Sequence, residues 1–479
     1  MTAIQSGAGE ESAQIMATRT GKLRQSRSIF RLAFLFLVAV ATSVNALEMG
    51  GLIEFGTSEL SLLWDSLDDH LWLSAMPPAS ADRRRQFGTR SARPPIRVVH
   101  YMGTNFGMTG VETFILQLAA AQKRAGLVPS IVMDLENRAE VQTIGEDLGI
   151  AVRNLPVRGE IESRLPRKLG TAILRTRRVQ ALTQILRDTD VLHIQAVGIS
   201  CLDGFVAAAL SRTKALIVTH HSTMSWFASR RDLLSDVTFW IEKRMASRVA
   251  MPYASAAKEL IEEGIPAQRT IVVPFCVDET LFSGVAPLPA SGELTLVMAA
   301  RMYPGKGQPE LLTALSRLHP RYPGVRALLV GDGPTRGEVE AEIDRRGLRN
   351  VVTSLGRLTH RDMPALMREA HVVVLPSYMS GEMFPICLIE GMALGLPAIA
   401  TRYSGIPEIV EHGETGILVE PRDADALANA IERFLTHPAF YSAMRQKALA
   451  RFRSHFASGA VANAYLEYYQ QALNAGTEA

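Results

Sequence analysis

Two glutamates, Glu382 and Glu390, lie eight positions apart in the mostly apolar run SGEMFPICLIEGMALGLP at residues 380–397. Burying a carboxylate is costly unless another group pairs with it, so each glutamate either faces solvent or belongs to a site. Pro385 suits the first position of a helix, which would place Glu382 in the preceding loop and Glu390 inside the helix. With about 1.5 Å of rise per helical residue, the two carboxylates would lie on the order of 10 Å apart.

The start of this helix would place unpaired backbone N–H groups between the two carboxylates. These groups belong to residues near Phe384, Ile386 and Cys387. The arrangement fits a molecule with hydroxyl groups at both ends and a phosphate in the middle. Glu390 would accept from ribose hydroxyls, the N–H groups would bind phosphate, and Glu382 would hold a sugar. The alternative is a capping glutamate followed by a glutamate on the helix surface.

A second charged pair, Arg301 and Lys306, lies in ARMYPGKG at residues 300–307, directly after a predicted strand. Two cations close to one strand end repel each other unless an anion lies between or beside them. A diphosphate would supply that charge, and arginine can bind it through two parallel hydrogen bonds. Two solvated surface cations are the alternative.

The first predicted strand runs into a glycine-rich loop, GTNFGMTGVETF at residues 103–114. Thr109 and Glu112 have the spacing of a capping box, which predicts that a helix begins at about Gly110. Gly103, Gly107 and Gly110 would let the backbone approach a ligand, and the helix start favours an anion. A tight turn without a ligand is the alternative.

Short apolar runs alternate with amphipathic helical patterns from residue 96 onward, which predicts an α/β fold with parallel sheets. In the first half, the predicted strands are residues 96–102, 129–135, 191–195, 215–221 and 248–253, and the predicted helices are residues 112–126 and 165–189. In the second half, the predicted strands are residues 294–301, 326–333, 350–356, 371–377, 397–401 and 416–420. Two doubly wound halves would flank a cleft, and such sheets bind ligands at the carboxyl ends of their strands.

The C-terminal stretch at residues 440–473 has the spacing of an amphipathic helix. Its predicted core residues are Phe452, Phe456, Tyr465 and Tyr468. Just before it, DAD at residues 423–425 has the form of a metal-binding D-x-D. Because it opens a helical pattern, a helix N-cap is the better interpretation.

The charged motifs together resemble the retaining GT-B glycosyltransferases of family 4. The resemblance rests on Arg301-x4-Lys306, on GDGP at residues 331–334, and on Glu382-x7-Glu390 with the residues that follow it. It extends over about residues 96–470 and is densest over residues 295–435. It implies two Rossmann-like domains that face a cleft, with a C-terminal helix that crosses back to the first domain. The second half would bind a nucleoside-diphosphate sugar and the first half an acceptor.

The resemblance also assigns roles. Arg301 and Lys306 would contact the diphosphate, Glu390 the ribose and Glu382 the transferred sugar. Gly110 would lie beside the phosphates, and His221 would lie near the sugar, with His220 as the neighbouring alternative. The predicted catalytic residues are therefore Glu382, His221, Arg301 and Lys306, and the predicted substrate-binding residues are Gly110, Glu390, Phe384, Ile386 and Asp332.

The family often has EGFG where this chain reads EMFP, so Met383 and Pro385 replace two glycines, and a proline offers no N–H. Departure of the leaving group puts negative charge on the nucleoside diphosphate, which the two cations and the helix start would stabilise. The resemblance implies retention of anomeric configuration. We expect no metal and no cofactor, since two cations already neutralise the diphosphate.

The predicted domains are a basic N-terminal tail with an apolar segment (1–95), an acceptor-side domain (96–276), a linker (277–292), a donor-binding domain (293–438) and a C-terminal helical segment (439–479). In the tail, basic residues precede the apolar run LAFLFLVAVAT at residues 32–42. This layout fits a secretory signal, a weak membrane anchor or an over-long gene start. Because nucleotide sugars are made in the cytosol, we expect a cytoplasmic protein that a weak anchor would hold at the inner face of the membrane.

Composition sets wider limits. The chain has 479 residues, 47% of them hydrophobic and 21% charged, with a net charge of +3, which is typical of a globular protein and too small to indicate nucleic-acid binding. Three widely spaced cysteines give no metal or disulfide pattern. One alternative is a dinucleotide-dependent oxidoreductase with Asp134 on the ribose, although the loop glycines have G-x3-G-x2-G spacing. The other is a non-catalytic scaffold that retains the fold.

Overall fold

The computed structural model describes residues 94–103, 110–134, 139–156, 167–197, 201–223 and 233–478. Within these ranges, no helix is long and apolar enough to span a bilayer. The predicted tail with its apolar run lies outside them, except for its last two residues, and so do Gly107 and Thr109 of the first loop.

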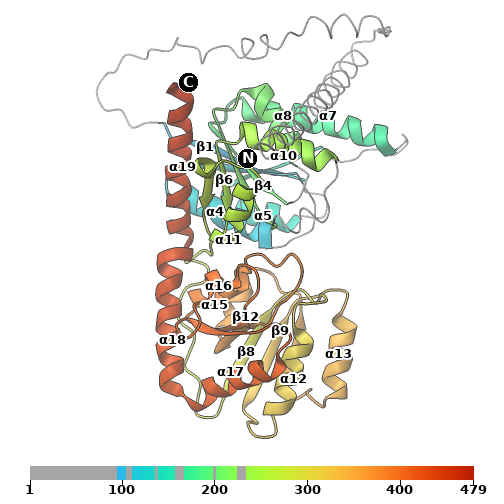
Figure 1. The fold of residues 1–479 in the computed structure, drawn as a ribbon, viewed down its shortest axis with the longest axis vertical. Helices are drawn as coiled ribbons and strands as arrows, with labels where there is room; N and C mark the ends of the chain where they lie inside the picture. Colours follow the sequence, from blue (N-terminus) through green and yellow to red (C-terminus); the bar gives the residue numbers. More distant parts are fainter. Residues whose placement is uncertain are drawn as a thin grey trace, which may run out of the picture. The chain divides into compact units, whose positions relative to one another are not determined.

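The first half of the chain forms a parallel sheet of seven strands in the order β3-β2-β1-β4-β5-β6-β7 (Figure 1). The strands are β1 (Arg97–Met102), β2 (Val128–Met133), β3 (Ala151–Asn154), β4 (Val191–Ala196), β5 (Ala215–His220), β6 (Arg248–Met251) and β7 (Thr270–Val272). The inner strands β1, β4 and β5 are mostly apolar and almost entirely buried, as expected of parallel strands covered on both faces. The strand order reverses between β1 and β4, which is where doubly wound sheets bind ligands.

The second half forms a parallel sheet of six strands in the order β10-β9-β8-β11-β12-β13. The strands are β8 (Leu294–Ala299), β9 (Val325–Val330), β10 (Val352–Gly356), β11 (Val372–Leu375), β12 (Ala398–Thr401) and β13 (Gly416–Val419). Here the order reverses between β8 and β11, which pair directly at Val372↔Leu296. The prediction of two doubly wound α/β halves is therefore confirmed.

Helices connect the strands of each sheet. In the first half they are α4 (Gly110–Arg124), α5 (Ala139–Asp147), α7 (Arg167–Leu186), α8 (Leu202–Ser211), α10 (Leu233–Met245), α11 (Ala254–Glu262) and the short 3₁₀ turn η1 (Ala267–Arg269). In the second half they are α12 (Gln308–Leu318), α13 (Arg336–Arg345), α14 (Met363–Met367), α15 (Ile386–Ala393), α16 (Ile406–Ile409) and α17 (Ala424–Thr436). Helix α17 begins as predicted, because Asp423 is its N-cap and accepts a hydrogen bond from the backbone N–H of Ala426 at 2.8 Å.

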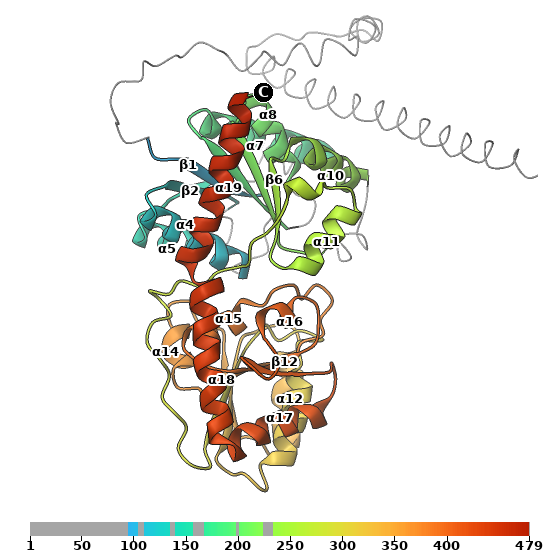
Figure 2. The same cartoon turned by 60° about the vertical axis from the view of Figure 1, so that its left-hand side comes forward.

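The C-terminal segment consists of two helices rather than the single helix that the sequence predicts. Helix α18 (Pro438–Arg451) runs into the π turn η2 (Phe452–Phe456), and α19 (Ser458–Glu478) follows. Between them Ala457 is extended and forms a parallel bridge with Val277. Helix α18 packs on α15 and α17, whereas α19 packs on α4 and β5, so the C-terminal segment crosses back to the first sheet as expected (Figure 2).

The break at Ala457 changes which aromatic residues are buried. Phe452, Phe456 and Tyr465 lie in the core as predicted. The prediction for Tyr468 is wrong, because this residue is only half-buried and Tyr469 is fully buried instead. Tyr465 and Tyr469 are four positions apart and so share one face of α19, whereas Tyr468 lies beside that face.

No helix or sheet strand lies between β7 and β8, where the sequence predicts a linker. This segment is nevertheless well packed, since Phe275, Cys276, Val277 and Phe282 are all buried. The exact domain boundaries within it stay a prediction.

Candidate functional site

Lys306 and Glu382 form an ion pair where the order of the second sheet reverses. Lys306 follows β8, Glu382 follows β11, and Nζ of the lysine donates to Oε2 of the glutamate at 2.7 Å. The two side chains are only 13% and 7% exposed. From the sequence we expected a ligand anion near this lysine or a solvated surface cation, whereas in the structure Glu382 supplies an anion from within the protein.

Ser377 holds the same carboxylate from the other side. Its Oγ donates to Oε2 of Glu382 at 2.6 Å, so both hydrogen bonds converge on one oxygen. Among the described residues, nothing donates to Oε1 of Glu382. That oxygen is free to accept a hydrogen bond from a ligand hydroxyl.

Gly307 explains how the two loops come close enough for this ion pair. It has φ of +94°, and a Cβ at this position would lie 2.4 Å from the carbonyl oxygen of Pro376. The backbone N–H of Tyr378 also donates to the carbonyl of Gly305 at 2.7 Å. Only glycine allows this close packing of the loop after β8 against the loop after β11.

Replacing Ser377 by alanine should weaken the hold on Glu382 without removing its charge partner. Losing one hydrogen bond to a buried charged group costs about 1.5–3 kcal/mol. We expect the Ser377→Ala variant to unfold at a lower urea concentration than the wild type. Ser316→Ala is the control, because it removes a hydroxyl that donates to the Leu312 carbonyl of its own helix and accepts from Arg346 at 3.4 Å. Unchanged stability in Ser377→Ala would show that Lys306 alone positions the carboxylate.

The start of α15 differs slightly from the prediction. Pro385 is its N-cap rather than its first residue, so the helix begins at Ile386. Phe384 lies outside the helix, and its ring packs among Tyr253, Phe275 and Phe456. Its side chain therefore belongs to the core, and among the predicted phosphate-binding groups the helix start retains the N–H groups of Ile386 and Cys387.

Gly110, the first residue of α4, lies close to this helix start. A Cβ placed on Gly110 would lie 3.5 Å from Cδ1 of Ile386. The start of α4 therefore lies next to the start of α15. From the sequence we assigned Gly110 and Ile386 to one ligand, and this assignment requires the two residues to be close. The electropositive ends of both helices favour an anion there.

Glu390 lies inside α15 and is 6% exposed. Burial raises the pKa of its carboxyl to about 7. Its neighbour is His360, from the segment after β10, whose Nδ1 lies 3.8 Å from Oε1 of Glu390. The sequence analysis did not identify His360.

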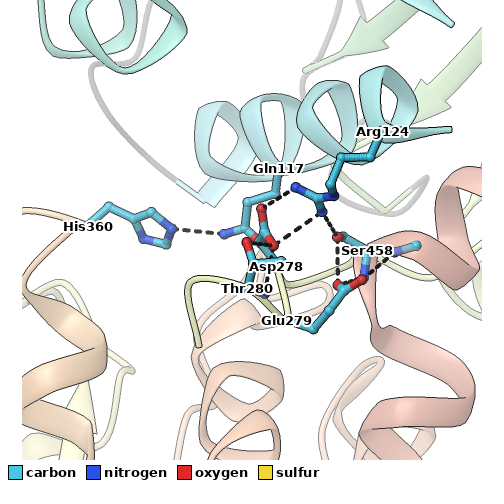
Figure 3. Close-up of polar contacts among 8 residues, drawn as sticks. Gln117, Arg124, Asp278, Glu279, Thr280, His360 and Ser458 are labelled. Carbon is cyan, nitrogen blue, oxygen red and sulfur yellow. Dashed lines mark hydrogen bonds and ion pairs between the residues drawn. The ribbon is translucent and has the colours of Figure 1, made fainter. Parts of the chain in front are cut away.

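Gln117 of α4 contacts His360 (Figure 3) and thereby determines which nitrogen of the His360 ring carries the proton. Oε1 of Gln117 accepts from the backbone N–H of Asp278 at 2.6 Å, and Nε2 of Gln117 lies 2.9 Å from Nε2 of His360. Because the amide nitrogen can only donate, Nε2 of His360 accepts and its proton lies on Nδ1, toward Glu390. Burial lowers the pKa of His360 to about 4, so the ring is neutral at pH 7.

Asp278 also anchors Arg124 at the end of α4. The arginine donates to both carboxylate oxygens, at 3.1 and 3.2 Å, and to Oγ of Ser458 at 2.9 Å. Glu279 in turn accepts from the backbone N–H and hydroxyl of Ser458, at 2.8 and 2.7 Å (Figure 3). These contacts fasten α4, the segment after β7 and the start of α19 to one another behind the site.

His221 follows β5 and is buried against the rings of Phe114 and Phe275. Its Nε2 lies 2.8 Å from Oε1 of Gln195, whereas its buried Nδ1 has no hydrogen-bond partner among the described residues. Burial lowers the pKa of His221 to about 3. His220, the alternative histidine, is instead paired with Glu242 at 2.7 Å.

Among the predicted charged residues, Arg301 and Asp332 are exposed. Arg301 lies over the ring of Tyr303 at 5.8 Å, and no acidic side chain in the described part of the chain pairs with it. Asp332 accepts from the backbone N–H of Gly333 at 2.7 Å and lies 3.6 Å from Arg336. The structure therefore leaves Arg301 available to an anion and engages Asp332 in its own turn.

Two family models match the chain, one over each half. Glycosyltransferase Family 4 matches residues 108–281, and Glycosyl transferases group 1 matches residues 286–451. The two matches meet in the segment between β7 and β8.

Individual relatives are similar over shorter stretches. The chain is 34% identical over 194 residues to exopolysaccharide phosphotransferase SCO2592 of Streptomyces coelicolor, which covers 40% of this chain and 20% of that protein. It is 27% identical over 289 residues to glycogen synthase of Mycobacterium tuberculosis, which covers 60% of this chain and 64% of the relative. The chain thus spans less than two thirds of the length of either relative.

Among solved structures, the chain is similar to Anabaena Alr3699/HepE in complex with UDP. The TM-score is 0.65 at 22% identity, and the match covers 78% of this chain and 100% of that one. At this identity the likeness shows a shared fold.

Proposed function

Because the chain belongs to the group 1 glycosyltransferases and has their GT-B fold, we propose that it transfers a hexosyl-type sugar from a nucleoside-diphosphate sugar with retention of anomeric configuration. The acceptor would be a sugar or a lipid-linked glycan in polysaccharide biosynthesis. The family membership argues against the oxidoreductase alternative.

The observation that carries this proposal is the cluster of Lys306, Glu382 and Ser377 at the point where β8 and β11 diverge. A nearly buried ion pair with one unoccupied carboxylate oxygen is costly to the fold and suits a ligand that is both anionic and rich in hydroxyls. The transferred sugar would donate a hydroxyl to Oε1 of Glu382. The diphosphate would lie on the side of Lys306.

The remaining groups extend the donor site. Arg301 has no acidic partner among the described residues and would bind the diphosphate, together with the N–H groups at the start of α15. Glu390 would accept from the ribose hydroxyls, and Gly110 would let the first half approach the phosphates. Asp332 would contribute through its backbone turn rather than its carboxylate.

The chemistry follows from where charge develops. As the bond between the sugar and the diphosphate breaks, negative charge grows on the leaving phosphate, and fixed positive groups stabilise that change. Lys306 is held in place by Glu382, which Ser377 holds in turn, so the lysine needs little reorganisation when the charge appears. The acceptor hydroxyl would attack from the face that the diphosphate leaves, and no metal is needed in this scheme.

Titration calorimetry and a donor panel test the proposal. We expect the full-length protein to bind uridine or guanosine diphosphate and to hydrolyse one nucleotide sugar slowly without an acceptor. Arg301→Ala should weaken nucleoside-diphosphate binding, whereas Arg326→Ala on the exposed side of β9 should not. NMR of the first-formed product gives the anomeric configuration. Absence of binding to every nucleoside diphosphate would favour a non-catalytic scaffold.

The proposed place of action is the cytoplasmic side of the membrane, where nucleotide sugars are made. Cell fractionation tests this directly. A product that has lost its N-terminal tail and resides outside the cytoplasmic membrane would contradict it.

A further inference from the structure

A continuous chain of buried hydrogen bonds links His221 to the C-terminal helix α19. From His221 the chain runs through Gln195, His100, Gln122, Tyr469, His193 and Thr219 to Tyr465. Its successive distances are 2.8, 3.1, 2.8, 3.0, 2.7, 2.7 and 2.8 Å. Every member but His221 is fully buried, and His221 is 9% exposed.

The amide groups of Gln195 and Gln122 determine which atom donates and which accepts in each hydrogen bond. Nε2 of Gln195 can only donate, so Nδ1 of His100 accepts and the proton of that ring lies on Nε2, where it is donated to Oε1 of Gln122. Nε2 of Gln122 donates to Oη of Tyr469. The hydroxyl of Tyr469 donates to Nδ1 of His193, whose Nε2 donates to Thr219.

The amide of Gln195 also determines which ring nitrogen of His221 carries the proton. Oε1 of Gln195 can only accept, so the proton of the neutral His221 ring lies on Nε2. Nδ1 then carries a bare lone pair, buried and without a partner among the described residues. A buried polar atom without a partner requires an explanation, and a hydroxyl group of a ligand would supply the missing donor.

The donor-to-acceptor directions of the hydrogen bonds in this chain depend on one another. Rotating the amide group of Gln195 or Gln122 by half a turn would reverse every hydrogen bond between His221 and Tyr465. Each histidine in the chain would then carry its proton on its other ring nitrogen. The reversed order would bury an N–H at Nδ1 of His221 with no acceptor in the described part of the chain. Unpaired buried N–H groups are rarer than under-satisfied acceptors, which favours the observed order.

We propose that Tyr469 and Gln122 are positioning residues that act through this chain to keep Nδ1 of His221 an acceptor for a hydroxyl of the transferred sugar or of the acceptor. The proposal rests on the proposed function, since it assigns His221 to that site. Tyr469 is the critical link, because its hydroxyl both accepts from Gln122 and donates to His193. Without that hydroxyl, both directions of the hydrogen bonds leave one buried N–H unpaired: that of Gln122 in the observed direction and that of His221 in the reversed one. The two directions then become similar in free energy.

The test is ¹⁵N NMR of the histidine side chains in the full-length protein, with His221 assigned by its loss in His221→Asn. In the wild type, we expect a single neutral tautomer protonated at Nε2. In Tyr469→Phe, the two ring nitrogens of His221 should move toward each other as both tautomers become populated. Tyr468→Phe, on the same helix but outside the chain, should match the wild type.

Donor turnover is measured on the same proteins, with circular dichroism to show that each is folded. Turnover in Tyr469→Phe should fall by about twofold to tenfold, in proportion to the loss of the competent tautomer. If Tyr469→Phe does not fold, Gln122→Met replaces it in the test. This variant removes the amide that accepts from His100 and donates to Tyr469, so we expect the same changes in tautomer and turnover.

Three results would overturn the inference: a wild-type His221 protonated at Nδ1, an unchanged His221 tautomer in folded Tyr469→Phe, or a loss of turnover without a change of tautomer. A wild-type protein that cleaves no donor would instead contradict the proposed function, while the NMR result would still decide whether the chain orders His221.

Discussion

Replacing Lys306 by alanine is expected to destabilise the protein by about 3 kcal/mol and to lower donor turnover by about 10²-fold or more. The loss of stability follows from the burial of the ion pair, because Glu382 would stay buried with Ser377 as its remaining partner. The loss of turnover follows from the missing positive charge at the leaving phosphate. Urea unfolding measures the first effect, and initial rates with the natural donor, on protein shown to be folded, measure the second.

A double variant separates the two effects. Lys306→Met combined with Glu382→Gln leaves no unpaired charge in the core, so it should regain most of the lost stability while remaining inactive. The exposed pair of Lys447 and Glu414 provides the matched control, and Lys447→Ala should change stability by less than about 0.5 kcal/mol. If the double variant were as unstable as Lys306→Ala, or if it kept its turnover, the pair would not have the role assigned to it.

The second large effect concerns pH and Glu390. Burial raises the pKa of this carboxyl from its ordinary value of 4.5 to about 7 in the folded protein. The folded state therefore holds a proton more tightly than the unfolded chain does. The stability that this difference contributes is complete below about pH 4.5 and is lost as the pH rises through 7. At 1.36 kcal/mol per unit of pKa, the whole contribution is about 3 kcal/mol.

Glu390→Gln removes the titrating group and so isolates this contribution. Between pH 5 and pH 8, we expect the stability of the wild type to fall relative to the variant by about 2 to 3 kcal/mol. Burial lowers the pKa of His360 from 6.5 to about 4, so this residue also contributes to the pH dependence of stability. Both proteins contain His360, so its contribution cancels in the difference between them. Urea unfolding of both proteins at several pH values measures it, and parallel curves would mean that Glu390 is ionised throughout.

The two strands that the sequence did not reveal lie at opposite edges of the first sheet. β3 reads AVRN and is mostly exposed, and β7 has only three residues, one of them buried. An edge strand pairs on one side only and needs no continuous apolar run, so neither segment resembles the buried strands that periodicity detects. The inner strands were predictable because both of their faces are covered.

The candidate site likewise contains residues that could be predicted from the sequence and contacts that could not. Charged residues after strand ends could be found from their spacing, because parallel strands place their carboxyl ends at one edge of a sheet. The contact between Gln117 and His360 could not be found, since the two residues are 243 positions apart and no local pattern links them. The same holds for the pairing of Lys306 with Glu382, which depends on how closely two loops pack around Gly307.

The break in the C-terminal segment has a mechanical consequence. The backbone passes from one sheet to the other twice, and the two passages are joined at Val277. Its N–H donates to the carbonyl of Phe456 and its carbonyl accepts from the N–H of Ser458, both at 3.0 Å. In the described part of the chain, the backbone makes no third crossing between the two sheets. A rotation of one sheet against the other would therefore have to change torsion angles in these two crossings, at residues such as Ala457.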